Sequence, residues 1–211
     1  MFVSPFDYSI IKRAKENALV KIVIHDLRQW TETTYKSVDD HPFGGGAGMV
    51  MLVEPIYKAL KGIRSTLTGK THIILTSAKG NQFTQQKAIA FKQDFDNIVI
   101  VCGHYEGVDE RVAEHLVDEE ISIGKYILSG GETAAMVITD ALVRLLPGAL
   151  GNEESLNEES FNDENLTEYP HYTRPSVFTT AEGEEWKVPE VLLNGNHKLI
   201  AEWRANQQKQ V

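Results

Sequence analysis

Short runs rich in Ile and Val alternate with longer amphipathic runs through residues 1–150 of this 211-residue chain. The short runs are bounded by turn residues, which is typical of strands, and cover residues 20–25, 72–76 and 97–102. The longer runs have the length and pattern of amphipathic helices and cover residues 9–18, 55–64, 84–93, 108–115 and 132–145. This alternation predicts an α/β fold with a parallel sheet and helices on both faces.

Three glycine-containing segments, residues 75–80, 102–107 and 123–132, are expected among the loops of this fold. Ligands bind beyond the carboxyl ends of parallel strands, and glycine lets the backbone approach them closely. A fourth glycine cluster, residues 43–49, lies in a long connection. None of the four matches the Walker phosphate-binding motif or the Gly-x-Gly-x-x-Gly dinucleotide motif. Taken one at a time, each is more simply explained as a tight turn.

The composition is that of an ordinary globular chain, with 21 basic and 30 acidic side chains and a formal net charge of −9. The single cysteine, Cys102, excludes an internal disulfide framework and favours a reducing cytoplasm. The apolar runs are far shorter than the roughly 20 residues of a membrane span, so no membrane partner is expected. Taken alone, the negative charge argues against a nucleic-acid partner.

The acidic charge is concentrated in one segment. Seven carboxylates and no basic side chain fall within residues 152–168, so the rest of the chain has a net charge of only −2. Such a polar, charged segment buries too little apolar area to offset its ordering entropy. We therefore expect an acidic flexible linker at 152–168, which separates a domain at 1–151 from a small helical C-terminal piece at 169–211. The basic surface that RNA would need can lie elsewhere, with Lys12, Arg13, Lys15, Lys198, Arg204 and Lys209 as candidates.

Eight segments in chain order carry a resemblance to a known family. They are Ser-Val-Asp-Asp at 37–40, Pro-Phe-Gly-Gly-Gly at 42–46, Cys-Gly-His-Tyr-Glu-Gly-Val-Asp-Glu-Arg-Val at 102–112, Glu-Ile-Ser-Ile-Gly at 120–124, Leu-Ser-Gly-Gly-Glu at 128–132, Pro-Gly at 147–148, Pro-His-Tyr-Thr-Arg-Pro at 170–175 and Val-Pro-Glu-Val-Leu-Leu at 188–193. Together they make the chain similar to bacterial tRNA (guanine-N1)-methyltransferases of the TrmD type, in the SPOUT superfamily. The resemblance runs from Ser4 to about Arg204.

The resemblance implies a deep trefoil knot late in the α/β domain and an obligate homodimer with a shared active site. It also implies methyl transfer from S-adenosylmethionine to the tRNA guanosine just 3′ of the anticodon, G37. The three glycine-containing segments match the family's cofactor pocket. The residues expected to hold the cofactor, largely through backbone groups, are Thr76, Ser77, Gly103, Tyr105, Glu106, Gly107, Ile123, Gly124, Lys125, Tyr126, Ile127, Leu128, Gly130 and Gly131.

Methylation of N1 requires a base for the N1 proton and a cation for the charge that develops on O6. Arg144 matches the family's catalytic arginine; without that match it would be interpreted as a charge favoured by a helix C-terminus. Glu159 stands where the family has an Asp before Ser-Phe, and it is one methylene longer. Glu158 and Asp163 are less favoured alternatives for the base. Magnesium is a further candidate near Glu106, although the sequence contains no metal-ligand motif.

The chain departs from the family pattern at several points. We expect a core strand to be missing ahead of Met1 and a basic helical segment to be missing after the helix at 196–208. Ala47 and Ala134 replace common prolines, and His104 replaces a common Arg. These departures keep open a truncated or degenerate paralogue that binds cofactor or tRNA with little activity. A SPOUT enzyme acting on ribose 2′-OH is disfavoured by the matches at 130–132 and 170–175.

Three further side chains have structural interpretations. Cys102 has no recognisable nucleophile partner and is expected to be a buried small apolar residue. Trp186 and Trp203 are expected to pack within the C-terminal piece, and stacking on a tRNA base is the minority interpretation.

Overall fold

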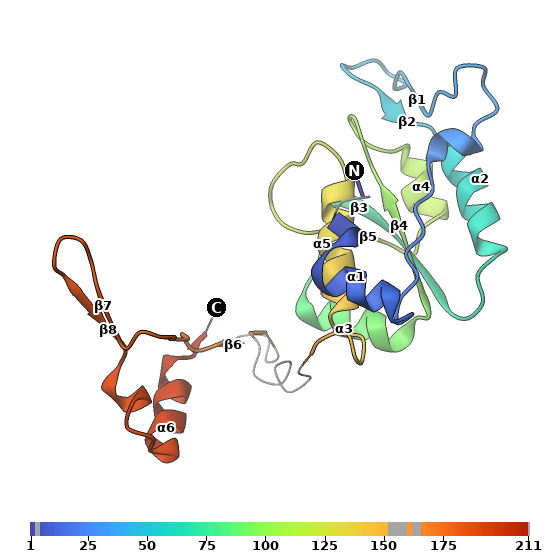
Figure 1. The fold of residues 1–211 in the computed structure, drawn as a ribbon. Helices are drawn as coiled ribbons and strands as arrows, with labels where there is room; N and C mark the ends of the chain where they lie inside the picture. Colours follow the sequence, from blue (N-terminus) through green and yellow to red (C-terminus); the bar gives the residue numbers. More distant parts are fainter. Residues whose placement is uncertain (3–4, 152–159, 162–165, 211) are drawn as a thin grey trace. The chain divides into compact units, whose positions relative to one another are not determined.

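A parallel three-stranded sheet in the order β4–β3–β5 forms the centre of the first unit in the computed structural model (Figure 1). The central strand β3 spans Thr71–Gln82, β4 spans Asn97–Cys102 and β5 spans Glu119–Ser122. The structure describes residues 1–2, 5–151, 160–161 and 166–210. It forms two units, Met1–Gly151 and Asn152–Val211, which are described separately below.

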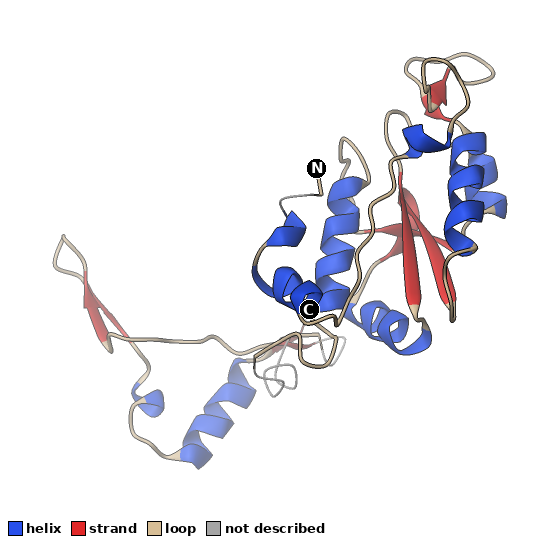
Figure 2. Cartoon of the chain, turned by 45° about the vertical axis from the view of Figure 1, so that its right-hand side comes forward, coloured by secondary structure: helices blue, strands red, loops and turns tan. Residues whose placement is uncertain are grey.

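Helices cover both faces of this sheet, as the alternation of the sequence predicts (Figure 2). Along β3, Ile73 and Leu75 pack in one apolar cluster with side chains of α2 and α4. The intervening Ile74 packs in another cluster with side chains of α3 and α5. Successive side chains of a strand point to opposite faces, so one apolar run supplies both clusters. The helices are α2 (Val53–Arg64), α3 (Gln85–Asp94), α4 (Glu110–His115) and α5 (Glu132–Val143).

The N-terminal residues form a third apolar layer against α5. The short helix η1 (Pro5–Asp7) and the helix α1 (Ser9–Glu16) bury Phe6, Ile11 and Ala14 in a cluster with Val143. The predicted helices are therefore all present. Their ends differ from the expected bounds by at most two residues. The helix α1 stops two residues before the expected Ala18, because Ala18 adopts a left-handed backbone conformation with φ of 57°.

The prediction of a strand at residues 20–25 is wrong. The segment is extended but belongs to no strand, and Val23 and Ile24 are 54% and 53% exposed. A strand exists only through its hydrogen-bonded neighbours, and none of the described residues supplies one. Within the described chain β4 likewise pairs with β3 alone. Intrinsic β preference alone therefore does not make a strand here.

Two further features of the sheet were not predicted from the sequence pattern. The strand β5 was missed because Glu119 and Glu120 interrupt its apolar character. The strand β3 continues to Gln82, beyond its expected end at Thr76, and its register against β5 shifts between Thr76 and Asn81. The residues 77–80, expected as a loop, are therefore a bulged part of a strand.

The first unit also contains a short 3-10 helix and a small antiparallel pair. The helix η2 spans Leu27–Trp30 and is capped by the Asp26 side chain, which accepts a hydrogen bond from the Arg28 nitrogen. The strands β1 (Asp39–Asp40) and β2 (Val50–Met51) pair antiparallel and flank the glycine cluster at 43–49.

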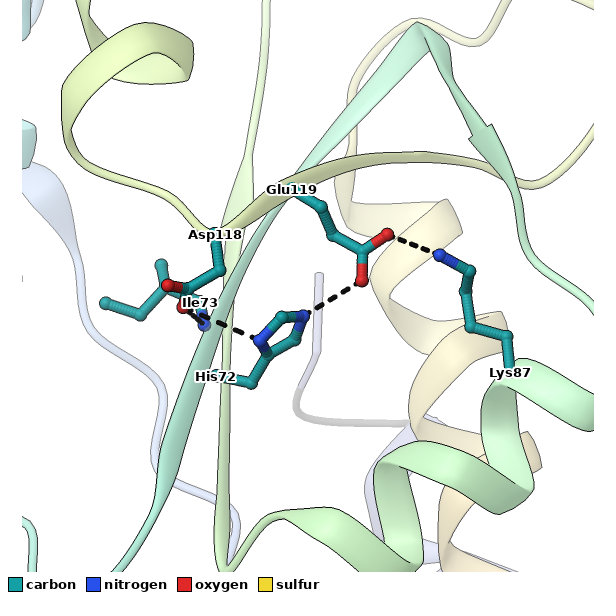
Figure 3. A network of polar contacts seen from close by, with 5 residues as sticks. All are labelled: His72, Ile73, Lys87, Asp118 and Glu119. Atoms are coloured by element: carbon teal, nitrogen blue, oxygen red, sulfur yellow. Dashed lines mark hydrogen bonds and ion pairs between the residues drawn. The ribbon is translucent and has the colours of Figure 1, made fainter.

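A polar network joins the amino ends of β3 and β5 to α3 (Figure 3). His72 Nε2 lies 2.9 Å from Glu119 Oε1, and the Lys87 ammonium pairs with the other Glu119 oxygen. The Ile73 nitrogen donates to Asp118 Oδ2 at 2.7 Å. Lys87 and His72 lower the pKa of Glu119 more than burial raises it. The network therefore holds an ionised carboxylate between strand and helix.

The described residues of the second unit form an α-helix and two small antiparallel strand pairs. The helix α6 spans His197–Gln207 and follows the short helix η4 (Glu190–Leu192). The strand β6 (Leu166–Thr167) pairs with β9 (Lys209–Gln210), and β7 (Val177–Thr179) pairs with β8 (Glu185–Lys187). A small helical piece was expected, and the strand pairs were not. The difference arises because Val-Phe-Thr has high β propensity and Gly183 provides the positive φ of the turn.

The tryptophans of this unit differ in burial. Trp203 is half-buried, with its ring 6.2 Å from that of Tyr172. Trp186 pairs with Phe178 across the β7–β8 hairpin but stays largely exposed, contrary to its expected packing.

Candidate active site

The loop that follows β4 and the loop that precedes α5 are joined directly through their backbones. The Gly131 nitrogen donates to the Gly103 oxygen at 2.7 Å, and His104 forms an antiparallel bridge with Gly130. These loops are far apart in the sequence, but both lie beyond the carboxyl end of the sheet, where ligands of parallel sheets bind. The structure thus brings together two of the three predicted cofactor segments.

The third segment joins them through Thr76, the last residue of β3 before the register shift. Its side chain is only 8% exposed, and its hydroxyl donates to the Val101 oxygen at 3.2 Å. A Cβ on Gly131 would overlap Thr76 Oγ1 and would lie 2.8 Å from the Gly103 nitrogen. Only glycine fits at position 131, because three backbone segments converge there. Thr76 therefore contributes a buried packing contact, whereas its neighbour Ser77 is less buried.

The predicted cofactor residues at 123–128 form a turn with a large exposed apolar surface. Ser122 Oγ donates to the Gly124 oxygen at 3.0 Å, and the Tyr126 nitrogen donates to the same oxygen. Lys125, Tyr126 and Leu128 are exposed, and Ile127 is 85% exposed. Exposed apolar side chains at such density are typical of surfaces that bind a ligand or a second protein.

The loop at 102–107 is also joined to the glycine cluster at 43–49. The Glu106 nitrogen donates to the Met49 oxygen at 3.1 Å, and the Met51 nitrogen donates to the Gly107 oxygen at 2.9 Å. The Glu106 carboxyl carbon lies 2.8 Å from where a Cβ on Gly48 would stand. The carboxylate therefore points toward the glycine cluster and remains exposed. Tyr105 adopts φ of 59°, which turns the chain tightly at this point.

Three residues that were not among the predicted site residues, namely Gly48, His104 and Glu132, also lie at this junction. A Cβ on Gly130 would overlap the Glu132 carboxylate and would lie 2.9 Å from His104 Cδ2, so both side chains border the same glycine. Gly48 belongs to the fourth glycine cluster, whose abundance of glycine was the only signal in the sequence. Glu132 begins α5, where a carboxylate is favoured by the helix dipole.

Cys102 lies beneath this junction and has the properties of a structural thiol. Burial, with a smaller contribution from the negative charge of Glu132, raises the pKa of the Cys102 thiol to about 12. The nucleophilic thiolate is therefore scarcely populated near neutral pH. Among the described residues, no cluster of three or more His, Cys, Asp or Glu side chains could hold a metal ion.

Arg144, one of the two predicted catalytic residues, does not lie at this junction within one chain. Arg144 caps the C-terminal end of α5, whereas Gly131 caps the N-terminal end that meets the loops. At about 1.5 Å of rise per residue, these 13 positions separate the two ends by roughly 20 Å. Arg144 is half-buried, and its nitrogen donates to the Asp140 oxygen. Glu159 and its alternatives Glu158 and Asp163 lie outside the described residues.

No helix in the described ranges combines the length and apolar character needed to cross a membrane.

A family model described as tRNA (Guanine-1)-methyltransferase TrmD matches residues 1–211. Curated proteins named tRNA (guanine-N(1)-)-methyltransferase, from Bacillus cereus (strain AH820), Bacillus anthracis (strain A0248) and Bacillus thuringiensis subsp. konkukian (strain 97-27), are 48% identical over 204 residues. The match covers 97% of this chain and 81% of each relative. The chain therefore belongs to the TrmD family of tRNA (guanine-N1)-methyltransferases.

Proposed function

We propose that the chain transfers a methyl group from S-adenosylmethionine to N1 of the guanosine that follows the tRNA anticodon, G37. The observation that carries this proposal is the convergence of the segments at 75–80, 102–107 and 123–132 on Gly131, in a chain of the TrmD family. The same geometry supports the trefoil knot that the resemblance implies.

The residues at the junction fit the methyl donor. At Gly103, Gly130 and Gly131 the backbone carries no side chain of its own, so a ligand such as an adenine edge can approach the remaining backbone groups closely; the Gly131 nitrogen and the Gly103 oxygen are already paired with each other. When bound, S-adenosylmethionine supplies an electrophilic methyl group on a positively charged sulfur. The exposed Glu106 carboxylate is the proposed partner for the positive charge of the methionyl part. The turn at 123–128 adds exposed apolar side chains beside the junction.

The chemistry requires one proton to leave guanine N1 as the N1–carbon bond forms and the sulfur–carbon bond breaks. We assign the proton to the Glu159 carboxylate and the stabilisation of charge on O6 to the Arg144 guanidinium. Arg144 lies at the opposite end of α5 from the junction, so one chain alone does not bring it to the cofactor segments. This separation supports a homodimer in which Arg144 of one subunit serves the cofactor site of its partner.

The surface around α5 also supports the homodimer. Tyr126, Ile127 and Leu128 precede the helix, and Val137 lies on it, and all four apolar side chains are exposed. Burying such a surface against a second copy would remove apolar area from water.

We further propose that residues 152–168 form a linker, that residues 169–211 contact tRNA, and that the enzyme works in the cytoplasm. The low-activity paralogue is not favoured, because the chain is 48% identical over 97% of its length to curated tRNA (guanine-N(1)-)-methyltransferases.

The primary experiment compares labelled-methyl transfer to a tRNA transcript that carries G37 and to one in which that G is replaced. We expect labelling of the first transcript only. Equal labelling of both would overturn the assignment of the target base, and labelling of neither would overturn the proposed activity.

The base is tested with Glu159→Gln, which we expect to reduce methyl transfer by about a hundredfold or more and to leave cofactor binding intact. Glu158→Gln is the matched control and should keep wild-type turnover. Unchanged turnover in Glu159→Gln would refute the assignment of the base.

The shared site is tested by mixing subunits that carry Arg144→Ala with subunits that carry Glu106→Ala. Each variant alone should be inactive, and the mixed dimer should regain activity at the one site that combines the two intact residues. No recovery in verified mixed dimers would contradict a shared site.

A further inference from the structure

A groove of about 520 Å³ lies in the second unit, between α6 and the residues that follow β6. Gln208, which follows the helix, lines the groove. The side chains of α6 that line it include His197, Ala201 and Arg204, at steps of three or four residues. This spacing places them on one face of the helix. Tyr169 lines the groove from the segment after β6. The volume falls within the range of small-molecule sites.

The groove combines a flat stacked surface with small neighbouring side chains. Tyr169 is 8% exposed, and the Arg204 guanidinium lies 4.6 Å from its ring centroid. Tyr169 thus supports one face of an exposed, planar cation. Ala201 and Ala205 line the groove beside it and leave space that larger side chains would occupy.

The charge of the groove differs from that of the whole chain. The lining contains Arg204 and no carboxylate, although the chain has a net charge of −9. Gln208 and the His197 ring add polar groups that can donate or accept hydrogen bonds at the edge of a planar ligand. A planar cation on an aromatic ring, with polar groups at the rim, is the chemistry that recognises unpaired nucleobases.

We propose that this groove binds one unpaired nucleobase of the tRNA substrate by stacking it on the Arg204 guanidinium. The inference rests on the proposed function for the choice of RNA as the ligand. It assigns Arg204 a contact with a base, beyond the neutralisation of phosphate charge. The second unit would then help to select the anticodon loop through an unstacked base, independently of the three segments of the first unit.

The decisive variant is Arg204→Lys in the full chain, because it keeps the charge and removes the planar face. Loss of base stacking lowers affinity by about five- to a hundredfold, so we expect KM for a G37 transcript to rise by about tenfold. The affinity for S-adenosylmethionine, measured by calorimetry, should not change. The rise in KM should persist as the salt concentration increases, because phosphate contacts weaken with salt and stacking does so much less.

Two further variants separate stacking from charge and from misfolding. Ala205→Leu fills the groove with a good helix former and should raise KM for tRNA with wild-type thermal stability. Lys198→Met removes one charge from the same helix outside the groove lining, and its effect should be small and should disappear at high salt. If Arg204→Lys and Ala205→Leu both bind the transcript like the wild type, the proposal is wrong. If Arg204→Met weakens tRNA binding and Arg204→Lys binds tRNA like the wild type, Arg204 contacts a phosphate through its charge alone. That outcome would also overturn the proposal.

The bound base is located with 2-aminopurine placed at each unpaired position of the anticodon loop in turn. We expect binding to change the fluorescence at one position in a way that Ala205→Leu abolishes. The same response in wild type and Ala205→Leu at every position would contradict the proposal. The proposed function fails separately, if the wild type binds tRNA through the groove but transfers no methyl group.

Discussion

The two ends of the parallel sheet in residues 1–151 are built from different chemical groups. At the carboxyl end, Gly103, Gly130 and Gly131 allow backbone segments to approach closely, with the side chains of Thr76, His104 and Glu132 packed against them. At the amino end, His72 and Glu119 are held in a network of largely buried polar side chains (Figure 3). The first arrangement depends on glycines that leave no room for a side chain of their own, and the second satisfies its polar groups through side-chain pairs. We propose that a ligand binds at the first end, and we expect the second end to contribute stability.

The largest effect is expected from Gly131→Ala at the carboxyl end. The new Cβ would overlap Thr76 Oγ1 and would lie 3.0 Å from Cys102 Cα, so the loops must separate. Overpacking costs about 1–3 kcal/mol, and we expect the affinity for S-adenosylmethionine to fall by up to about a hundredfold. Calorimetric titration measures this change. Gly151→Ala is the control, because its Cβ would meet no atom within 4 Å, and equal affinities in the two variants would contradict the role of Gly131.

At the amino end, Lys87→Met should destabilise the fold and spare the site. The change removes the cation that pairs with the largely buried Glu119, and it leaves the carboxylate with His72. Breaking a buried ion pair costs up to about 3–5 kcal/mol, and we expect about 2 kcal/mol for this partly exposed lysine. Urea unfolding measures the loss. Lys92→Met on the exposed face of α3 is the control, and a larger loss in the control would refute the comparison.

The same network predicts a pH dependence of stability. The pKa of Glu119 is lowered from its ordinary value of 4.5, so its contribution is present above that value and is lost as the pH falls through the lowered pKa. We expect Glu119→Gln to be less stable than the wild type near neutral pH and to lose less stability on acidification. Urea midpoints between neutral and acidic pH measure both. If the urea midpoints of the two proteins fell in parallel as the pH is lowered, Glu119 would not contribute to the loss of stability at acidic pH.

The smallest effect is expected from Lys79→Met, which removes an exposed ion pair near the carboxyl end. Lys79 Nζ lies 2.7 Å from Glu110 Oε1, and that hydrogen bond raises the pKa of Lys79. Both side chains are more than half exposed, so solvent screens the pair and we expect no measurable change in unfolding. If Lys79→Met lowered the free energy of unfolding as much as Lys87→Met does, burial would not explain the difference between the two ion pairs.

The sequence pattern predicted most elements of the first unit and failed where pairing or burial depends on distant residues. The strand β4 was predicted with its observed bounds, because five of its six side chains are apolar and turn residues flank it. Residues 20–25 have the same local character but lack a hydrogen-bonded neighbour in the described structure. The strand β5 was not predicted, because Glu119 and Glu120 interrupt its apolar pattern. Glu119 can lie in a strand there because it is paired with Lys87 and His72, which are distant in the sequence.

The amino-acid sequence by itself determined the α/β alternation, the helices and the motifs of the TrmD family, because these depend on local residue types and their order. Tertiary structure alone decided that Thr76, Gly103 and Gly131 meet at one point. It also decided that Arg204 stacks on Tyr169 in the second unit. Such contacts join residues that are distant along the chain, and they form only when packing fixes the positions of whole elements.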